Sequence, residues 1–372
     1  MSHVFLFGTL CWGDLLARVA GSTCPPHQVA ELPGYQVTWA AGQNFPAIYP
    51  QPGAMARGIL LRDCDASVLA RMDHYESGFG YTLHPVTVTQ GGEQVQAQVY
   101  LPPNGIGAGA PWVLQDWVDQ HGALALEAAI EVMLTQGHMS PDTMARRYPM
   151  MLVRADARLK AQSDPSYPSE SGLTRDDVQL HERRMPYVEF FAVQEHDLTL
   201  PKFQGGHTPQ VTRACLLATD AAIVLPYDPV RDRVLLIEQF RAGPYFRGDP
   251  NVWMMEPVAG RVDTGEDAEH TARREAVEEA NLTLGDVHLV HQGYASPGCS
   301  TEYFNIYVAC SDIPDEAAVT SGLESEAEDI KGHIVPFDTF YERLMAGQYP
   351  VTPLALAGYW LALNRDRLRS QS

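Results

Sequence analysis

The spacing of hydrophobic and polar residues changes twice along this chain of 372 residues. In the first third, short apolar runs and alternating segments predict strands at residues 4–10, 58–61 and 83–89. A short helix is expected at 66–74. From 111 to 158, apolar residues recur at helical spacing, with breaks at Gly122 and Gly137. We expect the apolar residues of these helices to pack in a core and to have no chemical role.

Apolar strands return in the second half of the chain. Two apolar segments, 221–226 and 234–241, flank a polar turn, which is the pattern of a hairpin. Later strands are expected at 304–309 and 333–336, and helices at 337–346 and 353–368. This order predicts a mixed sheet covered by helices, an α/β sandwich.

A segment at 162–172 separates these two parts. It is rich in Ser and Pro and shows no apolar periodicity, as is typical of a linker. The chain is also too long for one typical domain. We therefore predict a first domain at 1–160, a linker at 161–180 and a second domain at 181–372.

The charge and composition limit the partners that we expect. The net charge of −20 repels nucleic-acid phosphates, and no basic stripe offsets it. No apolar run is long enough to cross a membrane, and no basic region typical of a signal peptide precedes the first apolar residues. The six cysteines are scattered without a CxxC pair, which is typical of reduced thiols. These features predict a cytoplasmic protein without a nucleic-acid or membrane partner.

The densest group of chemically useful residues follows Gly260. A turn bounded by two glycines precedes a predicted helix at 267–280. On this helix Glu275, Glu278 and Glu279 are spaced i, i+3 and i+4, so that their carboxylates project from one face. Repulsion opposes this arrangement unless a cation lies between the acids, and Mg²⁺ prefers oxygen ligands of this kind. A solvated acidic helix face is the alternative.

The spacing of these residues resembles the signature of the Nudix family, GX5EX7REUXEEXGU, in which U is aliphatic. Gly260, Glu266, Arg274 and the three glutamates fall at its fixed positions. Two positions differ, because Ala276 is a small U and Asn281 replaces the closing Gly. Asn adopts the left-handed conformation more readily than other non-Gly residues, so it can still end the helix.

The segments around this signature resemble the ADP-ribose pyrophosphatase branch of the family. The similarity lies in LPYDPVRDRVLLIEQFR and EPVAG before the signature and in SPG, which contains Pro297, after it. The resemblance implies hydrolysis of ADP-ribose to AMP and ribose 5-phosphate, with Mg²⁺ or Mn²⁺ as cofactor. Another nucleoside diphosphate sugar is the alternative substrate. Relatives of this branch are commonly homodimers, which we also expect here.

The same resemblance assigns roles to individual residues. The metal ligands would be Glu275, Glu278, Glu279, Glu328 and the carbonyl of Ala259. Glu326, in an acidic loop, would be the catalytic base that deprotonates the attacking water, with Glu279 as the second catalytic carboxylate. Arg213, Arg241 and Pro297 would bind the substrate, the two arginines through phosphate or ribose oxygens.

The first predicted strand ends in Phe7-Gly8-Thr9-Leu10. This turn resembles the YGSL motif of the gamma-glutamylcyclotransferase-like (AIG2-like) family, with Phe7 in place of Tyr. The resemblance implies a small α+β barrel with added helices, in which the turn binds a γ-glutamyl group. Glu76 matches the general acid/base, which moves a proton while the amine of the substrate attacks its own side-chain amide carbonyl.

The two resemblances together predict an enzyme of two domains, an N-terminal barrel of gamma-glutamylcyclotransferase-like type and a C-terminal Nudix sandwich. This combination is similar to fused Nudix proteins associated with tellurite resistance. The expected partner is a small-molecule substrate. Two alternatives remain for the N-terminal domain, which could carry the main activity or be a binding module without activity.

Overall fold

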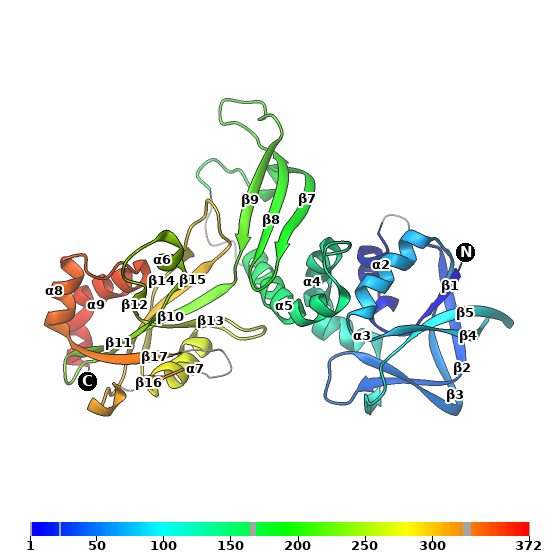
Figure 1. Ribbon diagram of the computed structural model, residues 1–372, viewed down its shortest axis with the longest axis horizontal. Helices are drawn as coiled ribbons and strands as arrows, with labels where there is room; N and C mark the ends of the chain where they lie inside the picture. Colours follow the sequence, from blue (N-terminus) through cyan, green and yellow to red (C-terminus); the bar gives the residue numbers. More distant parts are fainter. Residues whose placement is uncertain (1, 22–23, 164–168, 319, 323–328, 372) are drawn as a thin grey trace. The chain divides into compact units, whose positions relative to one another are not determined.

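The computed structural model describes the chain except for residues 1, 22–23, 164–168, 319, 323–328 and 372. Contacts divide it into two compact units, Met1–Ala214 and Cys215–Ser372 (Figure 1). The boundary predicted at 161–180 lies earlier in the chain and stays a prediction. Among the described helices, none combines the length and apolar character that crossing a membrane requires.

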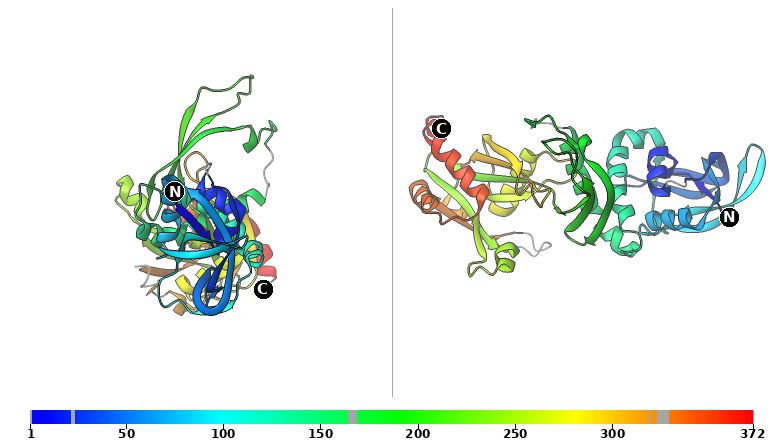
Figure 2. Two further views of the ribbon diagram at one scale, coloured as in Figure 1. Left: turned by 90° about the vertical axis from the view of Figure 1, so that its right-hand side faces the viewer. Right: turned by 90° about the horizontal axis from the view of Figure 1, so that it is seen from above.

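Five strands of the first unit close into a barrel (Figures 1 and 2). They are β1 (Ser2–Leu6), β2 (His27–Ala40), β3 (Pro46–Cys64), β4 (Thr82–Gln90) and β5 (Glu93–Leu101). β1 pairs with β3 and, in parallel, with β5, while β2 joins β3 to β4 and the β4–β5 hairpin completes the ring. The short strand β6 (Ala108–Pro111) pairs with β2 outside the ring. Val4, Phe5 and Val99 are fully buried, so β1 and β5 belong to the core of this unit.

The helices of the first unit include the stretch that we expected to be helical. They are α1 (Gly13–Ala20), α2 (Ala66–Ser77), α3 (Leu114–Trp117), α4 (Ala123–Leu134) and α5 (Pro141–Ser163). The break expected at Gly122 is wrong, because a π-helical turn, Val118–Gly122, joins α3 to α4. A Cβ at Gly122 would lie 3.3 Å from the ring of Trp12, so this glycine allows close packing and does not end a helix.

Three further strands follow α5, and the last of them runs across the boundary at Ala214. β7 (Gln179–Val188), β8 (Ala192–Thr199) and β9 (Val211–Leu217) form a three-stranded sheet in this order. An ion pair of 2.8 Å joins Arg147 of α5 to Glu189, directly after β7. This contact connects the sheet to the helices before it.

The second unit is built on one mixed sheet. Its strands are β10 (Asp220–Asp228), β11 (Arg233–Phe240), β12 (Trp253–Glu256), β13 (Val258–Arg261), β14 (Val287–Tyr294), β15 (Tyr303–Cys310), β16 (Thr320–Ser321) and β17 (Ile330–Pro336). β10 and β15 run parallel, and the other neighbours are antiparallel. The predicted hairpin is confirmed, since Tyr227 of β10 pairs with Val234 of β11.

Helices cover both faces of this sheet, as Figure 1 shows. They are α7 (Ala268–Ala280) on one face and α8 (Phe337–Met345) with α9 (Thr352–Ser370) on the other, while the short helix α6 (Ala242–Arg247) has no buried residue. Side chains of a strand alternate between its two faces. Accordingly, Val224 of β10 packs with Ala276 of α7, whereas its neighbour Leu225 packs with Leu361 of α9. The predicted α/β sandwich is thereby confirmed.

Two candidate active sites

Helix α7 has the ends that the sequence predicted. Asp267 caps its first turn by accepting a hydrogen bond of 2.8 Å from the backbone of His270. Asn281 ends it in the left-handed conformation, with φ of 50°. Ala276 is fully buried against the sheet, so a small residue fits at this position of the signature. The glutamates therefore occupy a face of α7 next to its packed face.

Arg274 organises the acidic residues around this helix. Its guanidinium donates hydrogen bonds of 2.7 Å to Glu275, 2.9 Å to Glu278 and 3.2 Å to Glu266. Burial acts to lower the pKa of Arg274, but the bonds and charges of Glu266 and Glu275 outweigh it and raise that pKa. The arginine therefore stays charged and supplies the cation that this cluster of carboxylates needs.

The strand before the signature lies directly against the glutamates. Glu279 is buried, with 4% of its surface exposed, and accepts a hydrogen bond of 3.0 Å from the backbone N–H of Ala259. A Cβ on Gly260 would collide with the side chain of Glu275, so a larger residue there would displace this glutamate. The structure thus places Ala259 against Glu279 and joins Glu275 to Glu278 through Arg274, and the role of these residues as metal ligands stays a prediction.

The described residues do not include every predicted ligand of the metal site. Within the described ranges, no group of three or more His, Cys, Asp or Glu side chains is placed so that it could hold a metal ion. Glu326 and Glu328 lie in 323–328, outside the described residues. The roles of these two residues therefore stay predictions.

Arg241 pairs with one carboxylate and acts through its charge on a second, and the sequence analysis singled out neither. Its Nε is 2.8 Å from Glu256. Burial raises the pKa of Glu256, and the charge of Arg241 opposes this shift. Burial also raises the pKa of Glu302, again opposed by Arg241. In the sequence, only the position of Glu256 just before PVAG could have indicated that it belongs to the site. Nothing in the pattern indicated the same for Glu302.

The other two predicted substrate residues are exposed. Arg213 lies on β9 in the first unit and donates a hydrogen bond of 3.1 Å to the carbonyl of Thr212. Pro297 lies in the turn after β14 in the second unit. The two units are not placed relative to each other, so the structure does not bring Arg213 to the Nudix signature.

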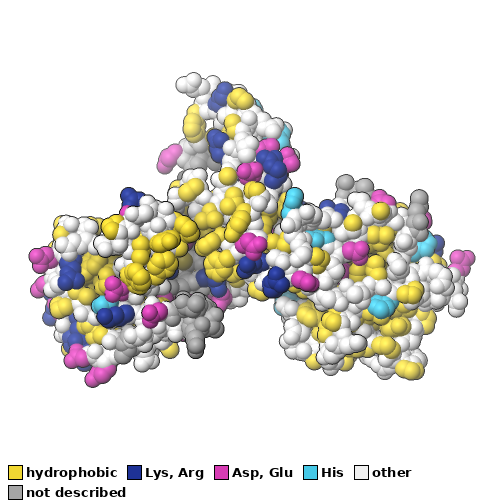
Figure 3. Space-filling model, viewed as in Figure 1, with side chains coloured by type: hydrophobic (Ala, Val, Ile, Leu, Met, Phe, Trp, Pro, Cys, Tyr) yellow, Lys and Arg dark blue, Asp and Glu magenta, His cyan; other side chains and the backbone are white. Residues whose placement is uncertain are grey.

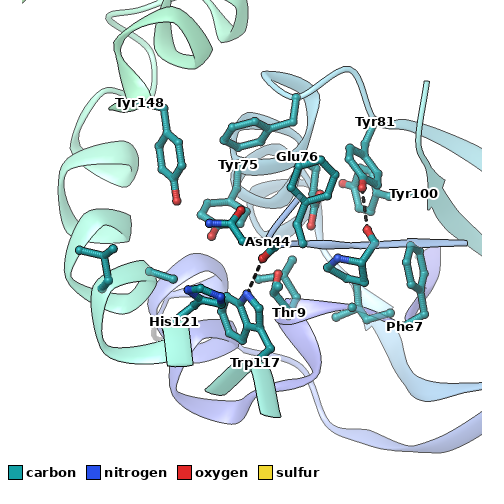
Figure 4. Close-up of a pocket in the computed structure, with 18 of the residues that line it drawn as sticks. Phe7, Thr9, Asn44, Tyr75, Glu76, Tyr81, Tyr100, Trp117, His121 and Tyr148 are labelled. Carbon is teal, nitrogen blue, oxygen red and sulfur yellow. Dashed lines mark hydrogen bonds between the residues drawn. The ribbon is translucent and has the colours of Figure 1, made fainter. Parts of the chain in front are cut away.

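The first unit holds the second candidate site, a cavity of about 160 Å³ beside the barrel (Figure 4). All four residues of the predicted turn line it, namely Phe7, Gly8, Thr9 and Leu10. β1 ends at Leu6, and a single 3-10 turn, Thr9–Cys11, follows. The turn therefore forms one wall of the cavity.

Glu76 also lines this cavity, from the last turn of α2. The helix expected at 66–74 was too short, because it continues to Ser77 and carries Glu76 with it. His74 anchors this end of α2, since its ring bonds Thr135 at 2.9 Å, just after α4. Burial raises the pKa of Glu76 to about 7, so this carboxyl can both accept and donate a proton near neutral pH.

The remaining walls carry residues that the sequence analysis missed. They include Asn44, Tyr75, Tyr81, Tyr100, Trp117, His121 and Tyr148, which are labelled in Figure 4. Three of them are held by hydrogen bonds, from Tyr81 to Pro46 (2.9 Å), from Tyr100 to Asp73 (2.6 Å) and from Trp117 to Asn44 (2.9 Å). No spacing rule relates them in sequence, since they come from separate loops, strands and helices.

Comparison with known protein families assigns both halves of the chain. The family model described as gamma-glutamyl cyclotransferase, AIG2-like, matches residues 4–119. The NUDIX domain model matches residues 217–355. Both family predictions from the sequence are confirmed, and so is the fold of each domain.

Curated relatives match the C-terminal half. The ADP-ribose pyrophosphatase of Escherichia coli (strain K12) is 34% identical over 197 residues, which are 53% of this chain and 93% of that protein. The ADP-ribose pyrophosphatase of Haemophilus influenzae is 29% identical over 198 residues, 53% of this chain and 91% of that protein. The GDP-mannose pyrophosphatase of Salmonella paratyphi A is 30% identical over 129 residues, 35% of this chain and 66% of that protein.

A solved structure described as an ADP compounds hydrolase aligns with a TM-score of 0.40 and 20% identity, over 51% of this chain and 97% of that one. The relative from Escherichia coli is matched over nearly its whole length together with the NUDIX domain model. The chain therefore belongs to the Nudix family, and its C-terminal domain is a Nudix hydrolase.

Proposed function

We propose that the C-terminal domain hydrolyses the diphosphate of ADP-ribose to AMP and ribose 5-phosphate. The observation that carries this proposal is the acidic face of α7, with Arg274 between its glutamates and the strand of Ala259 packed against it. The relatives that this chain matches over nine-tenths of their length are ADP-ribose pyrophosphatases. We therefore favour ADP-ribose as the substrate.

For this site we propose Mg²⁺ as the cofactor, with Mn²⁺ as the alternative, because the predicted ligands are oxygen donors of the kind that a hard divalent ion prefers. Glu275, Glu278, Glu279 and the carbonyl of Ala259 would hold it, joined by Glu328. All of these are oxygen donors, and a guanidinium already balances the charge of Glu275 and Glu278. When bound, the ion would neutralise the diphosphate and make water more acidic.

The residues of the chain would then bind the substrate and remove a proton. Arg241 is held by Glu256, so its guanidinium is oriented before a phosphate or ribose oxygen arrives. Arg213 and Pro297 complete the proposed substrate contacts. Glu326 would take the proton from the attacking water. Another nucleoside diphosphate sugar is the alternative substrate, because a GDP-mannose pyrophosphatase is also among the relatives.

The test is release of AMP from ADP-ribose, measured in the full chain with Mg²⁺. We expect Glu279→Gln to lower kcat/KM by ~100-fold or more, since even residues that only support metal ligands contribute 10- to 100-fold. Glu342→Gln, which changes an exposed glutamate of α8, is the matched control and should retain the activity. Rapid hydrolysis of GDP-mannose with ADP-ribose untouched would replace our substrate with the alternative.

A second activity is favoured by the position of Glu76. A carboxyl with a pKa of about 7 faces the same cavity as the Phe7–Leu10 turn, which suits γ-glutamyl cyclotransferase chemistry. The turn would bind the γ-glutamyl group. The α-amine of the substrate would attack its own side-chain amide carbon, and Glu76 would move the proton from that amine to the leaving nitrogen. The products are 5-oxoproline and a free amine.

Release of 5-oxoproline tests this second activity. Glu76→Gln should abolish it, whereas Glu93→Gln, on an exposed position of β5, should not. A domain that binds γ-glutamyl compounds equally well with Glu76 or Gln, and releases no 5-oxoproline, would be a binding module instead. Isothermal titration with both variants separates these outcomes.

We also propose a homodimer in the cytoplasm without a nucleic-acid partner. Exposed aromatic residues beside Arg241 support the dimer, because large exposed apolar areas usually mark contact surfaces. These residues are Phe240, Tyr245, Phe246 and Trp253, whose exposed rings contact one another. Hydrophobic side chains are also gathered on the visible face of the second unit (Figure 3). Light scattering of the purified chain would give the mass of the particle in solution.

A further inference from the structure

A groove of about 900 Å³ lies among α1, α2, α4 and β7 in the first unit, and neither proposed activity uses it. Its lining residues differ from those of the cavity around Glu76, with no residue in common. Large apolar side chains and arginines make up most of the described lining. Such a combination is typical of a site for a molecule that is apolar at one end and charged at the other.

Helix α4 supplies the apolar side of the groove. Four of its residues share one face of the helix over about 12 Å, namely Leu126, Ile130, Met133 and Leu134. All four are only partly buried, whereas the buried positions of α4 hold smaller residues such as Ala128. The expectation that the apolar residues of this helix pack in a core is therefore wrong for these four, which line a groove instead.

Three arginines line the same groove, Arg18 of α1, Arg71 of α2 and Arg183 of β7. Arg71 is fixed at the end of α1, because it donates hydrogen bonds to the carbonyls of Val19 (2.7 Å) and Arg18 (3.1 Å). Asp14 is the one carboxylate among the described lining residues. The groove therefore has an excess of two positive charges, in a chain whose net charge is −20.

Arg183 is the least neutralised of these arginines. Within the described part of the chain it forms no ion pair, and its buried Nε has no hydrogen-bond partner. Burial lowers the pKa of Arg183, and the charges of three other arginines, Arg18 among them, add to this shift while Glu127 opposes it. Glu127 is already paired with Arg158 at 2.6 Å. An anion in the groove would relieve this repulsion among guanidinium groups.

The lining also limits the chemistry of the ligand. No described lining residue has an amide or hydroxyl side chain, so the base and ribose of a nucleotide would find few partners. A hydrocarbon chain suits the apolar face of α4, and guanidinium groups suit phosphate oxygens. A phosphate monoester carries about 1.5 to 2 negative charges at pH 7, which matches the excess positive charge of the groove.

We propose that this groove binds a single-chain amphipathic anion, a phosphate monoester of an apolar alcohol. Its head lies at Arg18 and Arg183, and its chain lies along the apolar face of α4. The ligand is a free molecule and not a membrane lipid, because the apolar residues of α4 are partly buried, whereas a helix that enters a membrane surface exposes its apolar face. The groove is separate from both candidate active sites, so this binding does not depend on either proposed activity.

The test is calorimetric titration of decyl phosphate into the full chain, below the concentration at which this compound forms micelles. EDTA is present, so that no metal ion on α7 attracts the phosphate. We expect one saturable site, with an affinity at least ~10-fold above those for inorganic phosphate and for decyltrimethylammonium. Octyl phosphate should bind ~10-fold more weakly, because two fewer methylene groups are buried. Equal affinity for the cationic compound, or no binding of decyl phosphate, would overturn the proposal.

Replacing Arg183 tests the position of the head group. Arg183→Gln should weaken the binding of decyl phosphate at least ~10-fold, which is the effect of losing a hydrogen bond to a charged group. It should not lower the melting temperature of the free protein, because Arg183 has no ion-pair partner to lose among the described residues. Arg57→Gln removes the same charge from an exposed position of β3 and should keep the wild-type affinity. Wild-type affinity in Arg183→Gln would contradict the proposal.

A carboxylate on the apolar face tests the position of the chain. Ile130→Glu should abolish the binding of decyl phosphate, whereas Ala123→Glu adds the same charge at an exposed position of α4 and should not. Leu134→Gln, with an expected loss of ~10-fold, serves if the first variant does not fold. Unchanged affinity in either folded variant would contradict the proposal.

Two other occupants of the groove give different results. Sedimentation of the chain with vesicles that contain phosphatidic acid, without binding of free decyl phosphate, would assign the groove to a membrane surface. Binding of an acidic amphipathic peptide, again without binding of decyl phosphate, would assign it to a protein partner. Either result would overturn the proposal.

Discussion

The two candidate sites use the same side chain in opposite electrostatic settings. Glu76 lies in a cavity whose described lining residues include no Lys or Arg, and burial raises its pKa to about 7. Glu275 and Glu278 instead share the guanidinium of Arg274 at 2.7 and 2.9 Å. Burial without a nearby cation favours the protonated form of a carboxyl, whereas a shared guanidinium offsets the repulsion among neighbouring carboxylates. The neighbours of a glutamate, and not the residue itself, decide its chemistry.

The largest effect that would test this comparison is expected at Glu76. Its folded-state pKa is raised, so the unfolded chain loses the proton first and stability falls as pH rises from about 4.5 to about 7. Glu76→Gln removes this cost and should stabilise the first unit at pH 8 by about 3 kcal/mol, but by less than about 1 kcal/mol at pH 5. Urea denaturation at both pH values measures this difference.

The control for this prediction is Glu93→Gln, whose exposed side chain should leave stability unchanged at both pH values. If Glu76→Gln changed stability equally at pH 5 and pH 8, the pKa of Glu76 would not be raised in the folded chain. The electrostatic contrast between the two sites would then not hold.

The second largest effect is expected when Arg274, the cation of the acidic site on α7, is replaced. Arg274→Met leaves the carboxylates of Glu266, Glu275 and Glu278 without their shared partner, and we expect a loss of about 2 kcal/mol in stability. Mg²⁺ should raise the melting temperature of this variant more than that of the wild type, because a bound ion replaces the lost charge. Calorimetry with Mg²⁺ and with EDTA gives both values, and no response to Mg²⁺ in either protein would count against a metal site on α7.

The electrostatic setting of Glu256 is intermediate between those of the two sites, since its carboxyl is buried, like that of Glu76, but has a guanidinium, that of Arg241, beside it. A double-mutant cycle with Arg241→Gln and Glu256→Gln should give a coupling energy of about 1 kcal/mol, because the arginine is partly exposed. The same cycle on KM for ADP-ribose shows whether the pair orients Arg241 for the substrate. Additive effects on both quantities would mean that the pair has no such role.

The smallest effect is expected at the end of α7. Asn281 adopts a left-handed conformation with φ of 50°, which glycine adopts without strain. Asn281→Gly should therefore stabilise the second unit by about 0.5 kcal/mol and leave AMP release unchanged. Thermal denaturation measures the shift, and a destabilised variant would show that the Asn side chain contributes more than its backbone conformation.

The sequence predicted the acidic site better than the cavity, for a physical reason. The acidic face and the two ends of α7 depend on residues close together in one helix, so their spacing determines their geometry. The cavity around Glu76 depends on contacts between distant strands and helices. Leu124 and Leu152, which line this cavity, also fit the spacing of core residues, so nothing in the pattern separated a cavity wall from a packed core.

The closed barrel limits how the first unit can be altered. β1 starts at Ser2 and is hydrogen-bonded to β3 on one side and β5 on the other. Trimming this strand would leave two long unpaired strand edges, which readily pair with other chains. It would also remove Phe5 and Leu6 from the cavity wall. Tagged and shortened variants should therefore keep the first ten residues intact. We expect insoluble protein if these residues are removed.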